Sequence, residues 1–331
     1  MVGTRRSGSN LLRVMLHQLE GITAPHPPHI LQVFSPLVER YADLNEDNNF
    51  FELINDVCLL VEKNIVPWEA MPFDRKLLIN RASAYPRSLE AVFFAVYDVY
   101  TKMTHNSRWC CKSLSNIHHI EFIEKQEVLP QYIHIYRDGR DVALSFQKTP
   151  VGHKHYYHIA TQWQEEQRLA LELKNMVGEG RYVGIKYEDL MQDTQAVLYK
   201  LCLFLNVSFS EKMLSFFHSK ESSKTASSGA MWENLTKPVM HQNIGKFRQQ
   251  MKEDDIHLFE SVAGDMLLNL GYELTILNTK KPLDISMQDI SKFDKENDYQ
   301  KQLFQQKIAT QENHLRARRE HFIKTLQEAY V

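Results

Sequence analysis

The sequence has little cysteine and no long hydrophobic run. None of its apolar stretches approaches the roughly 18 residues of a membrane span, and it shows no signal-peptide pattern. The four cysteines, Cys58, Cys110, Cys111 and Cys202, lack the C-x-x-C spacing of a metal site. We therefore expect no membrane span. We also expect the four thiols to be reduced, which fits a cytoplasmic location because disulfides are rare in reducing compartments.

An excess of charge of either sign is also absent. The chain has 39 Lys and Arg against 41 Asp and Glu, a formal net charge of −2 at pH 7. Nucleic-acid binding is therefore not expected, because it needs a broad basic surface, and any anion site must be a local pocket. With 331 residues, 43% of them hydrophobic, the chain can bury a substantial core.

Two glycines near the start enclose the first candidate site. Residues 3–10 read Gly3-Thr4-Arg5-Arg6-Ser7-Gly8-Ser9-Asn10, and an apolar helical pattern follows them. Backbone N–H groups of such a loop, with the N-terminus of the next helix, can bind a phosphate. Position 9 is serine where a Walker A motif requires lysine, so Arg5 and Arg6 supply the positive charge instead. The pattern predicts a site for a phosphate-like group; the alternative is an ordinary turn.

Three cations follow predicted strands. Arg6 lies in this loop, Lys112 follows a strand at residues 108–111, and Arg137 follows a strand at residues 132–136. In open α/β sheets, ligands bind beyond the carboxyl ends of the strands. We therefore expect these cations to converge on one polyanionic ligand.

The intervening segments predict mostly helix. Residues 30–106 carry apolar residues at helical spacing and are expected to cover a substrate cavity. Residues 254–270 predict a core helix that ends at Gly271. By composition alone, residues 219–247, which begin with a Ser- and Gly-rich stretch and contain spaced cations, favour a flexible linker, with a flap over a phosphate as the alternative.

After residue 280 a sparse apolar stripe indicates a long appended helix, which packs on its own domain or forms a homodimer. Its members are Phe304, Ile308, Leu315, Phe322 and Leu326.

Two groups of histidines stand out. His26 and His29 lie in a stiff proline-rich segment after the loop, either as functional groups or as incidental residues of a surface turn. His153, His155 and His158 have a spacing that puts no pair on one helical face, so no metal site is predicted.

With both anion motifs in view, the chain resembles the sulfotransferases that use 3′-phosphoadenosine 5′-phosphosulfate (PAPS), in particular the bacterial and tyrosylprotein-sulfotransferase-like branch. Residues 3–10 are similar to the family's 5′-phosphosulfate loop, and Arg137-Asp138-Gly139-Arg140-Asp141 with Ser145 is similar to its 3′-phosphate motif. The resemblance covers about residues 1–275. Two departures are Phe247, where tryptophan is usual, and a nearly absent first strand, which leaves open whether the natural start lies upstream of Met1.

The resemblance implies an α/β, P-loop-like three-layer fold with a central, mainly parallel sheet. Residues 1–280 would form the sulfotransferase domain, with residues 30–106 as a helical insertion on the substrate side. Residues 281–331 would be a charged helical extension without a family counterpart. Two late segments, 236–239 and 245–248, are similar to the part that folds over the cofactor, which favours the flap over the linker.

The resemblance also implies roles for individual residues. Arg6 and Lys112 would stabilise the transferred group, with His26 as general base, since no carboxylate occupies the equivalent segment; His29 and the histidines at 153–158 are alternatives. PAPS would be the co-substrate, without a metal, and the acceptor could be a small molecule, glycan, lipid or peptide. The expected PAPS-binding residues are Arg5, Arg6, Ser7, Gly8, Ser9, Asn10, Arg137, Ser145, Tyr187, Lys237 and Lys246.

Two other functions stay open from the sequence. A P-loop kinase or NTPase would need the missing Walker lysine and a magnesium-binding acid. A non-catalytic nucleotide-binding or interaction protein could use the same loop without transferring anything.

Overall fold

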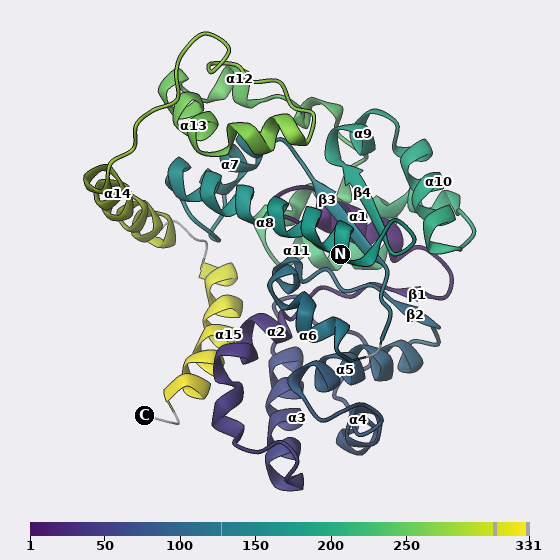
Figure 1. Cartoon of the computed structure of the whole chain (residues 1–331). Helices are drawn as coiled ribbons and strands as arrows, with labels where there is room; N and C mark the ends of the chain where they lie inside the picture. Colours follow the sequence, from purple (N-terminus) through teal and green to yellow (C-terminus); the bar gives the residue numbers. More distant parts are fainter. Residues whose placement is uncertain (127, 307–309, 329–331) are drawn as a thin grey trace.

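Short parallel strands lie at the centre of the protein (Figure 1), which is known from a computed structural model that describes residues 1–126, 128–306 and 310–328. Strand β3 (Tyr132–Tyr136) pairs with β4 (Tyr182–Lys186), and β1 (Ile22–Thr23) pairs with β2 (Arg108–Trp109), in both cases in parallel. The chain is mixed α/β and mostly helical, as predicted. Its P-loop-like and three-layer character stays a prediction.

The first two residues connect the two strand pairs. The amino group of Met1 donates a hydrogen bond of 2.9 Å to the Cys111 carbonyl, just after β2. On the other side Val2 forms a parallel bridge with β3, through its N–H to the Ile133 carbonyl at 2.8 Å. The expected first strand is therefore reduced to a single bridge, and the loop starts directly from it.

One group of helices packs around these strands. Leu12, Met15 and Leu16 of α1 share a core cluster with Ile133 of β3 and Ile185 of β4. Helices α8 and α13 pack against each other and, with α7, enclose a second cluster around the fully buried Trp163. The bounds in this group are α1 (Ser9–Leu16), α6 (Ile120–Glu124), α7 (Gly139–Gln147), α8 (Tyr156–Val177), α9 (Tyr187–Gln192), α10 (Thr194–Leu205) and α13 (Glu253–Asn269).

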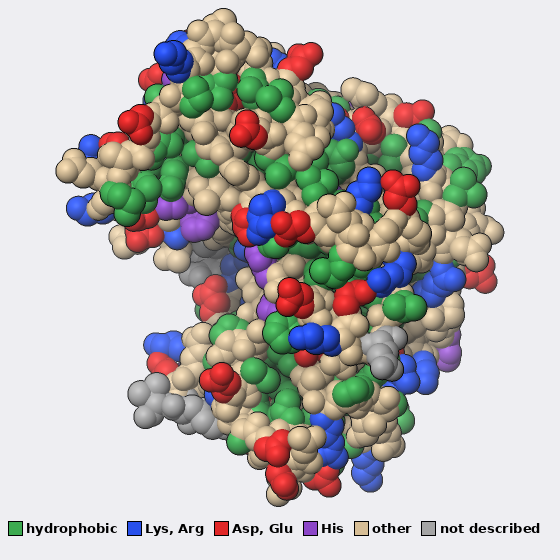
Figure 2. Space-filling view, in the orientation of Figure 1, with side chains coloured by type: hydrophobic (Ala, Val, Ile, Leu, Met, Phe, Trp, Pro, Cys, Tyr) green, Lys and Arg blue, Asp and Glu red, His purple; other side chains and the backbone are tan. Residues whose placement is uncertain are grey.

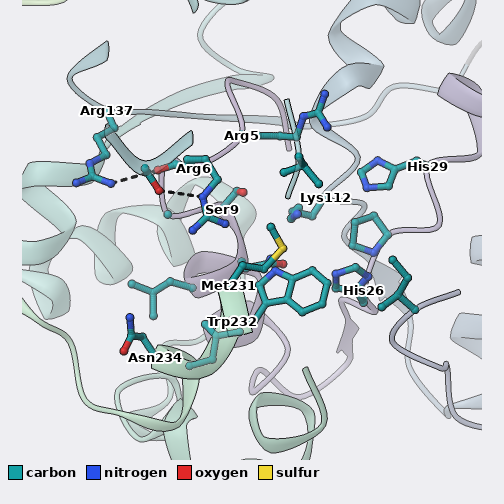
Figure 3. A pocket seen from close by; sticks show the side chains of 18 of the residues that line it. Arg5, Arg6, Ser9, His26, His29, Lys112, Arg137, Met231, Trp232 and Asn234 are labelled. Atoms are coloured by element: carbon teal, nitrogen blue, oxygen red, sulfur yellow. Dashed lines mark hydrogen bonds between the residues drawn. The ribbon is translucent and has the colours of Figure 1, made fainter. Parts of the chain in front are cut away.

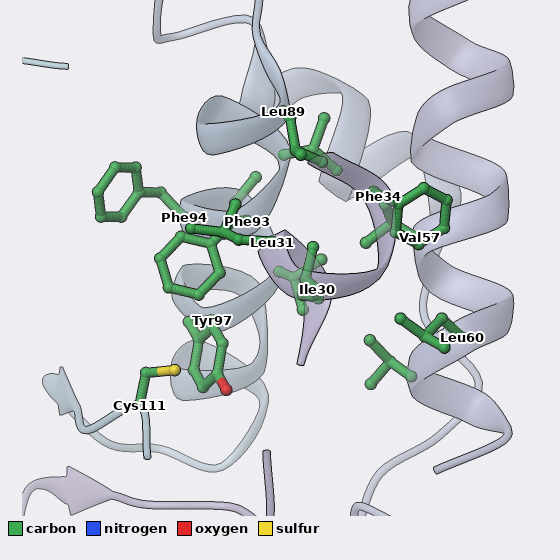
Figure 4. Close-up of a cluster of buried hydrophobic side chains, with 14 of the residues drawn as sticks. Ile30, Leu31, Phe34, Val57, Leu60, Leu89, Phe93, Phe94, Tyr97 and Cys111 are labelled. Atoms are coloured by element: carbon green, nitrogen blue, oxygen red, sulfur yellow. The ribbon is translucent and has the colours of Figure 1, made fainter. Parts of the chain in front are cut away.

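Residues 30–106 form a helical layer beside the strands, as predicted. Its helices are α2 (Ile30–Phe34), extended by a 3₁₀ helix (Ser35–Tyr41), then α3 (Asp47–Glu62), α4 (Arg75–Ala82) and α5 (Leu89–Met103). Phe34, Val57 and Phe93, from three of these helices, meet in the largest apolar cluster (Figure 4). This layer provides a rigid wall next to the loop at residues 3–8.

Residues 219–247 are largely helical, so the composition-based expectation of a flexible linker is wrong. Helix α11 (Lys220–Ser227) buries Ser222 and Thr225 completely. Arg13 of α1 binds it through Glu221 at 2.6 Å and Thr225 at 2.8 Å. The 3₁₀ helices Phe216–His218 and Ala230–Thr236 pack against α11. The other short helices are α12 (Phe247–Gln250) and the 3₁₀ helices Leu114–His119, Glu211–Met213 and His241–Asn243.

Two helices follow residue 280, α14 (Met287–Gln306) and α15 (Thr310–Glu328). Phe322 and Leu326 of α15 pack against the helical layer, and Phe304 of α14 lies under Lys154. Ile308 and the side chain of Leu315, also in the predicted stripe, lie outside the described residues. The described part of the stripe thus packs within the chain, and a homodimer stays a prediction. None of the described helices is long and apolar enough to cross a membrane.

Candidate functional site

A cavity of about 570 Å³ lies where the loop at residues 3–8 meets the helical layer (Figure 3). Seven basic residues line it: Arg5, Arg6, Lys112, Arg137, Lys237, Arg316 and Arg319. No Asp or Glu lines it among the described residues. Acidic and basic side chains alternate on the outer face seen in Figure 2. Positive charge is therefore concentrated in this cavity, which suits a ligand with several negative charges.

The loop holds an unusual backbone. Gly8 has φ of 84°, and a Cβ there would lie 2.5 Å from the Tyr187 ring, so only glycine fits. Arg6, a non-glycine residue, has φ of 75°, a conformation that is rare and concentrated at functional sites. Gly8 leaves the first N–H groups of α1 without a side-chain cap, and Ser7 Oγ is buried without a partner among the described residues. Free donors of this kind form an anion site.

Arg6 and Arg137 meet at one end of the cavity. Arg6 Nε donates to Ser145 Oγ at 3.0 Å, and Arg137 donates to the Arg6 carbonyl at 3.3 Å. The guanidinium of Arg137 lies over the Tyr187 ring, 4.5 Å from its centroid. Burial, with Arg137 nearby, lowers the pKa of Arg6 to about 10, so it still carries its charge at pH 7. Two arginines this close favour a bound anion between them.

The other charged residues of the motif at 137–141 hold the backbone around Arg137. Arg140 is 1% exposed and forms ion pairs with Asp138 at 2.7 Å and Glu260 at 2.6 Å. Asp141 accepts hydrogen bonds from the N–H groups of Gly245 and Phe247, at 2.7 and 2.9 Å. The motif therefore divides into one arginine that faces the cavity and charged residues that fix the backbone around it.

Lys112 lies in the middle of the cavity wall (Figure 3). Burial lowers its pKa to about 7, and Arg13, Arg6 and Arg5 add to the effect. At neutral pH this lysine is consequently poised between its charged and neutral forms. A negatively charged ligand would favour the charged form.

His26 and His29 occupy the end of the cavity away from Arg137 (Figure 3). Both ring nitrogens of His26 and Nδ1 of His29 are buried without a hydrogen-bond partner among the described residues. The His26 carbonyl accepts from Asn64 at 2.9 Å and Trp68 at 2.6 Å, which holds the segment in place. Burial first, then nearby cations, lowers the pKa of both imidazoles well below the usual 6.5. Both rings are therefore neutral at pH 7 and able to accept a proton.

The wall around these histidines comes from two distant segments. The Trp232 ring meets His26 edge-on, with 4.9 Å between centroids. Arg316 and Arg319 reach the cavity from α15, with Arg316 over Trp232 at 5.9 Å and Arg319 donating to the Pro28 carbonyl at 3.0 Å. The sequence analysis missed these three residues. Their only sequence signal is the i, i+3 spacing of the two arginines, which puts both on one helical face.

Most of the predicted site residues line this one cavity, including both candidate catalytic cations and His26. They are Arg5, Arg6, Gly8, Ser9, Asn10, His26, Lys112, Arg137, Ser145, Tyr187 and Lys237. Two predicted PAPS-binding residues do not line it. Ser7, within the loop, is fully buried, and Lys246 donates to Asn243 at 2.6 Å.

The other histidine group lies elsewhere and faces α14. His155 contacts Glu296 at 3.4 Å, and His158 contacts Asp294 at 3.1 Å. Among the described residues, no three His, Cys, Asp or Glu side chains are grouped so that they could hold a metal ion.

Comparisons with known proteins agree with one another. Residues 1–211 match the model of the sulfotransferase family. Among solved structures, the sulfotransferase domain from the Synechococcus PCC 7002 olefin synthase matches with a TM-score of 0.57 and 22% identity, over 83% of this chain and 94% of that one. The sulfotransferase domain from the curacin biosynthetic pathway matches with a TM-score of 0.58 and 21% identity, over 83% and 97%. At these identities the two structures share the fold. No curated protein matches significantly.

Proposed function

This chain belongs to the sulfotransferase family, and on that premise we propose that it transfers a sulfuryl group from PAPS to an acceptor hydroxyl or amine. One observation carries the proposal. The cavity combines seven cations with an anion-binding loop and no lining carboxylate among the described residues. PAPS carries its negative charge on three groups, a 3′-phosphate, a 5′-phosphate and a sulfate, so a strongly cationic cavity suits it.

We assign the donor to the end of the cavity near Arg137. The loop N–H groups, Arg6 and Lys112 would hold the 5′-phosphosulfate in a P-loop-like arrangement. Arg137 and Ser145 would bind the 3′-phosphate. Ser145 Oγ already accepts a hydrogen bond from Arg6, so its own O–H is available to donate. Arg5 and Lys237 add charge, and Tyr187 lies beside the position expected for the adenosine.

In the proposed reaction the acceptor oxygen attacks sulfur in line with the leaving group. A bond forms between that oxygen and sulfur, and the bond from sulfur to the bridging oxygen of the 5′-phosphate breaks. The products are a sulfate ester and adenosine 3′,5′-bisphosphate, and the acceptor's proton passes to a base. Negative charge grows on the bridging oxygen, where Lys112 and the loop donors can stabilise it without rearrangement.

His26 is our candidate for that base. A neutral imidazole can take the proton at pH 7, and the negative charges of a bound donor would raise the pKa of His26 from its low value in the free protein. His29, also neutral and buried, is the alternative.

The donor assignment also separates this proposal from a kinase. Magnesium-dependent phosphoryl transfer uses carboxylates to hold the metal, and none lines the cavity among the described residues.

The four free cysteines support a reducing, cytoplasmic location.

Calorimetric titration with adenosine 3′,5′-bisphosphate, alongside ATP with magnesium, tests this proposal. We expect clear preference for the bisphosphate and at least a hundredfold weaker binding in Arg137→Ala, because a charged, bidentate phosphate contact is lost. Arg137→Lys should bind with intermediate affinity, since lysine keeps the charge but not the fork. Preference for ATP, or no binding of the bisphosphate, would overturn the proposal.

A further inference from the structure

Helix α15 brings two arginines to the end of the cavity where the acceptor would bind. Arg316 and Arg319 lie one helical turn apart and both line the cavity. Arg316 is 9% exposed, with one nitrogen 3.3 Å from Met231 Sδ and its guanidinium over Trp232. The packing of Phe322 and Leu326 on the helical layer holds this face of α15 against the cavity.

These arginines surround the candidate base rather than the donor end. Trp232, under Arg316, packs edge-on against His26. Arg319 binds the carbonyl of Pro28, which lies between His26 and His29 in the chain. Arg319 is among the charges that lower the pKa of both histidines, and Arg137 is not. The cavity therefore has a cationic group at each end, with the proposed transfer site between them.

Among the described residues, no carboxylate inside the cavity balances the charge of Arg319. Its hydrogen bond goes to a neutral carbonyl, and its acidic neighbour Glu320 is exposed and lies outside the lining. Burial lowers the pKa of Arg319; the charge of Glu320 opposes this effect and that of Arg316 adds to it. Holding a cation such as Arg319 in a partly dehydrated space costs free energy unless an anion joins it. In the proposed function, the charges of PAPS lie at the other end of the cavity.

We infer that the acceptor carries an anionic group, a carboxylate, sulfate or phosphate, which Arg319 binds together with Arg316 while the acceptor's hydroxyl lies at His26. This inference rests on the proposed function, because it takes the Arg137 end as the donor's place. It makes residues beyond 280 part of the acceptor site. The guanidinium fork of arginine suits the paired oxygens of such a group.

The test uses the full chain saturated with adenosine 3′,5′-bisphosphate and two probes of one shape. These are 4-hydroxyphenylacetate and its uncharged amide, 4-hydroxyphenylacetamide, titrated by calorimetry. We expect the carboxylate to bind at least tenfold more tightly than the amide, and Arg319→Gln to abolish the difference. Arg318→Gln is the matched control, because it removes one positive charge from an exposed neighbouring position outside the lining.

The outcomes distinguish a failure of the acceptor inference from a failure of the proposed function. Equal binding of the probes, binding of neither, or the same loss of selectivity in Arg318→Gln overturns the inference. A tenfold loss of bisphosphate affinity in Arg319→Gln also overturns it, because the arginine then serves the donor. If the bisphosphate itself does not bind the wild-type protein, the proposed function fails first.

Discussion

The ion-pair network behind Arg137 and the buried His26 ring at the other end of the cavity differ in how their polar groups are satisfied. Behind Arg137, buried charges are paired inside the chain: Arg140 with Asp138 and Glu260. Around His26, both ring nitrogens of the buried imidazole lack partners among the described residues. Completed networks fix the shape of a site, whereas buried polar groups without partners cost stability unless a ligand supplies the missing hydrogen bonds.

The largest effect on stability is expected where the ion-pair network of Arg140 is broken. Arg140→Gln would leave the buried carboxylates of Asp138 and Glu260 without their cation, and we expect it to lower the free energy of unfolding by about 3–5 kcal/mol. Arg168→Gln is the control, since Arg168 is exposed and pairs with Glu165 and Glu172 on the surface. Its urea midpoint should stay at the wild-type value. Equal midpoints for both variants would contradict the comparison.

A second prediction concerns the loop at residues 3–8, at the Arg137 end of the cavity. Gly8→Ala puts a Cβ 2.5 Å from the Tyr187 ring at a φ of 84°. We expect at least tenfold weaker binding of adenosine 3′,5′-bisphosphate, because the loop or Tyr187 must move. Gly178→Ala has a similar φ of 72° but nothing within 4 Å of the new Cβ. Gly178→Ala should bind adenosine 3′,5′-bisphosphate with wild-type affinity. An equal loss of affinity in Gly178→Ala would show that backbone strain, and not the geometry of the loop, weakens binding.

The sequence predicted the Arg137 end of the cavity because the signals for this end are local. The glycines of residues 3–8 and the strand before Arg137 are read from short segments, and strand ends bring Arg6, Lys112 and Arg137 to one cavity. Local patterns alone do not separate Arg137 from Arg140; the family resemblance selected Arg137 for the 3′-phosphate. Both are arginines of one motif, and only tertiary contacts with α13 turn the second into a structural residue.

The His26 end was predicted only in part: the sequence indicated His26 and His29, but not the residues around them, because this end is assembled from segments distant in the chain. His26, Trp232 and Arg319 come from three such segments, and none carries a motif. Residues 219–247 misled for a related reason. Their Ser- and Gly-rich composition favoured a flexible linker, yet Thr225 is a buried partner of Arg13, which is itself fully buried.

Lys112 lies between the two ends, and its pH dependence tests which end it serves. Its pKa is about 7 in the free protein, and a bound anion would raise that value. Binding then takes up a proton, so affinity for adenosine 3′,5′-bisphosphate should fall by up to about tenfold per pH unit above pH 7.

Calorimetry between about pH 7.5 and 9 measures this fall, because the phosphate is already fully ionised there. Lys112→Arg should remove the slope, since arginine keeps its charge throughout. A slope unchanged in Lys112→Arg would assign the proton to another group.

The smallest expected effect on stability lies at the His26 end of the cavity. His26→Leu removes a buried imidazole whose nitrogens lack partners among the described residues, so we expect the free energy of unfolding to stay constant or rise by about 1 kcal/mol. Its affinity for adenosine 3′,5′-bisphosphate should not change. His134→Leu is the matched control, because that equally buried ring contacts Tyr182 at 2.6 Å and Gln167 at 2.8 Å. Losing those contacts should cost about 1–3 kcal/mol. If urea unfolding shows both variants destabilised alike, His26 is a structural histidine and the comparison between the two ends fails.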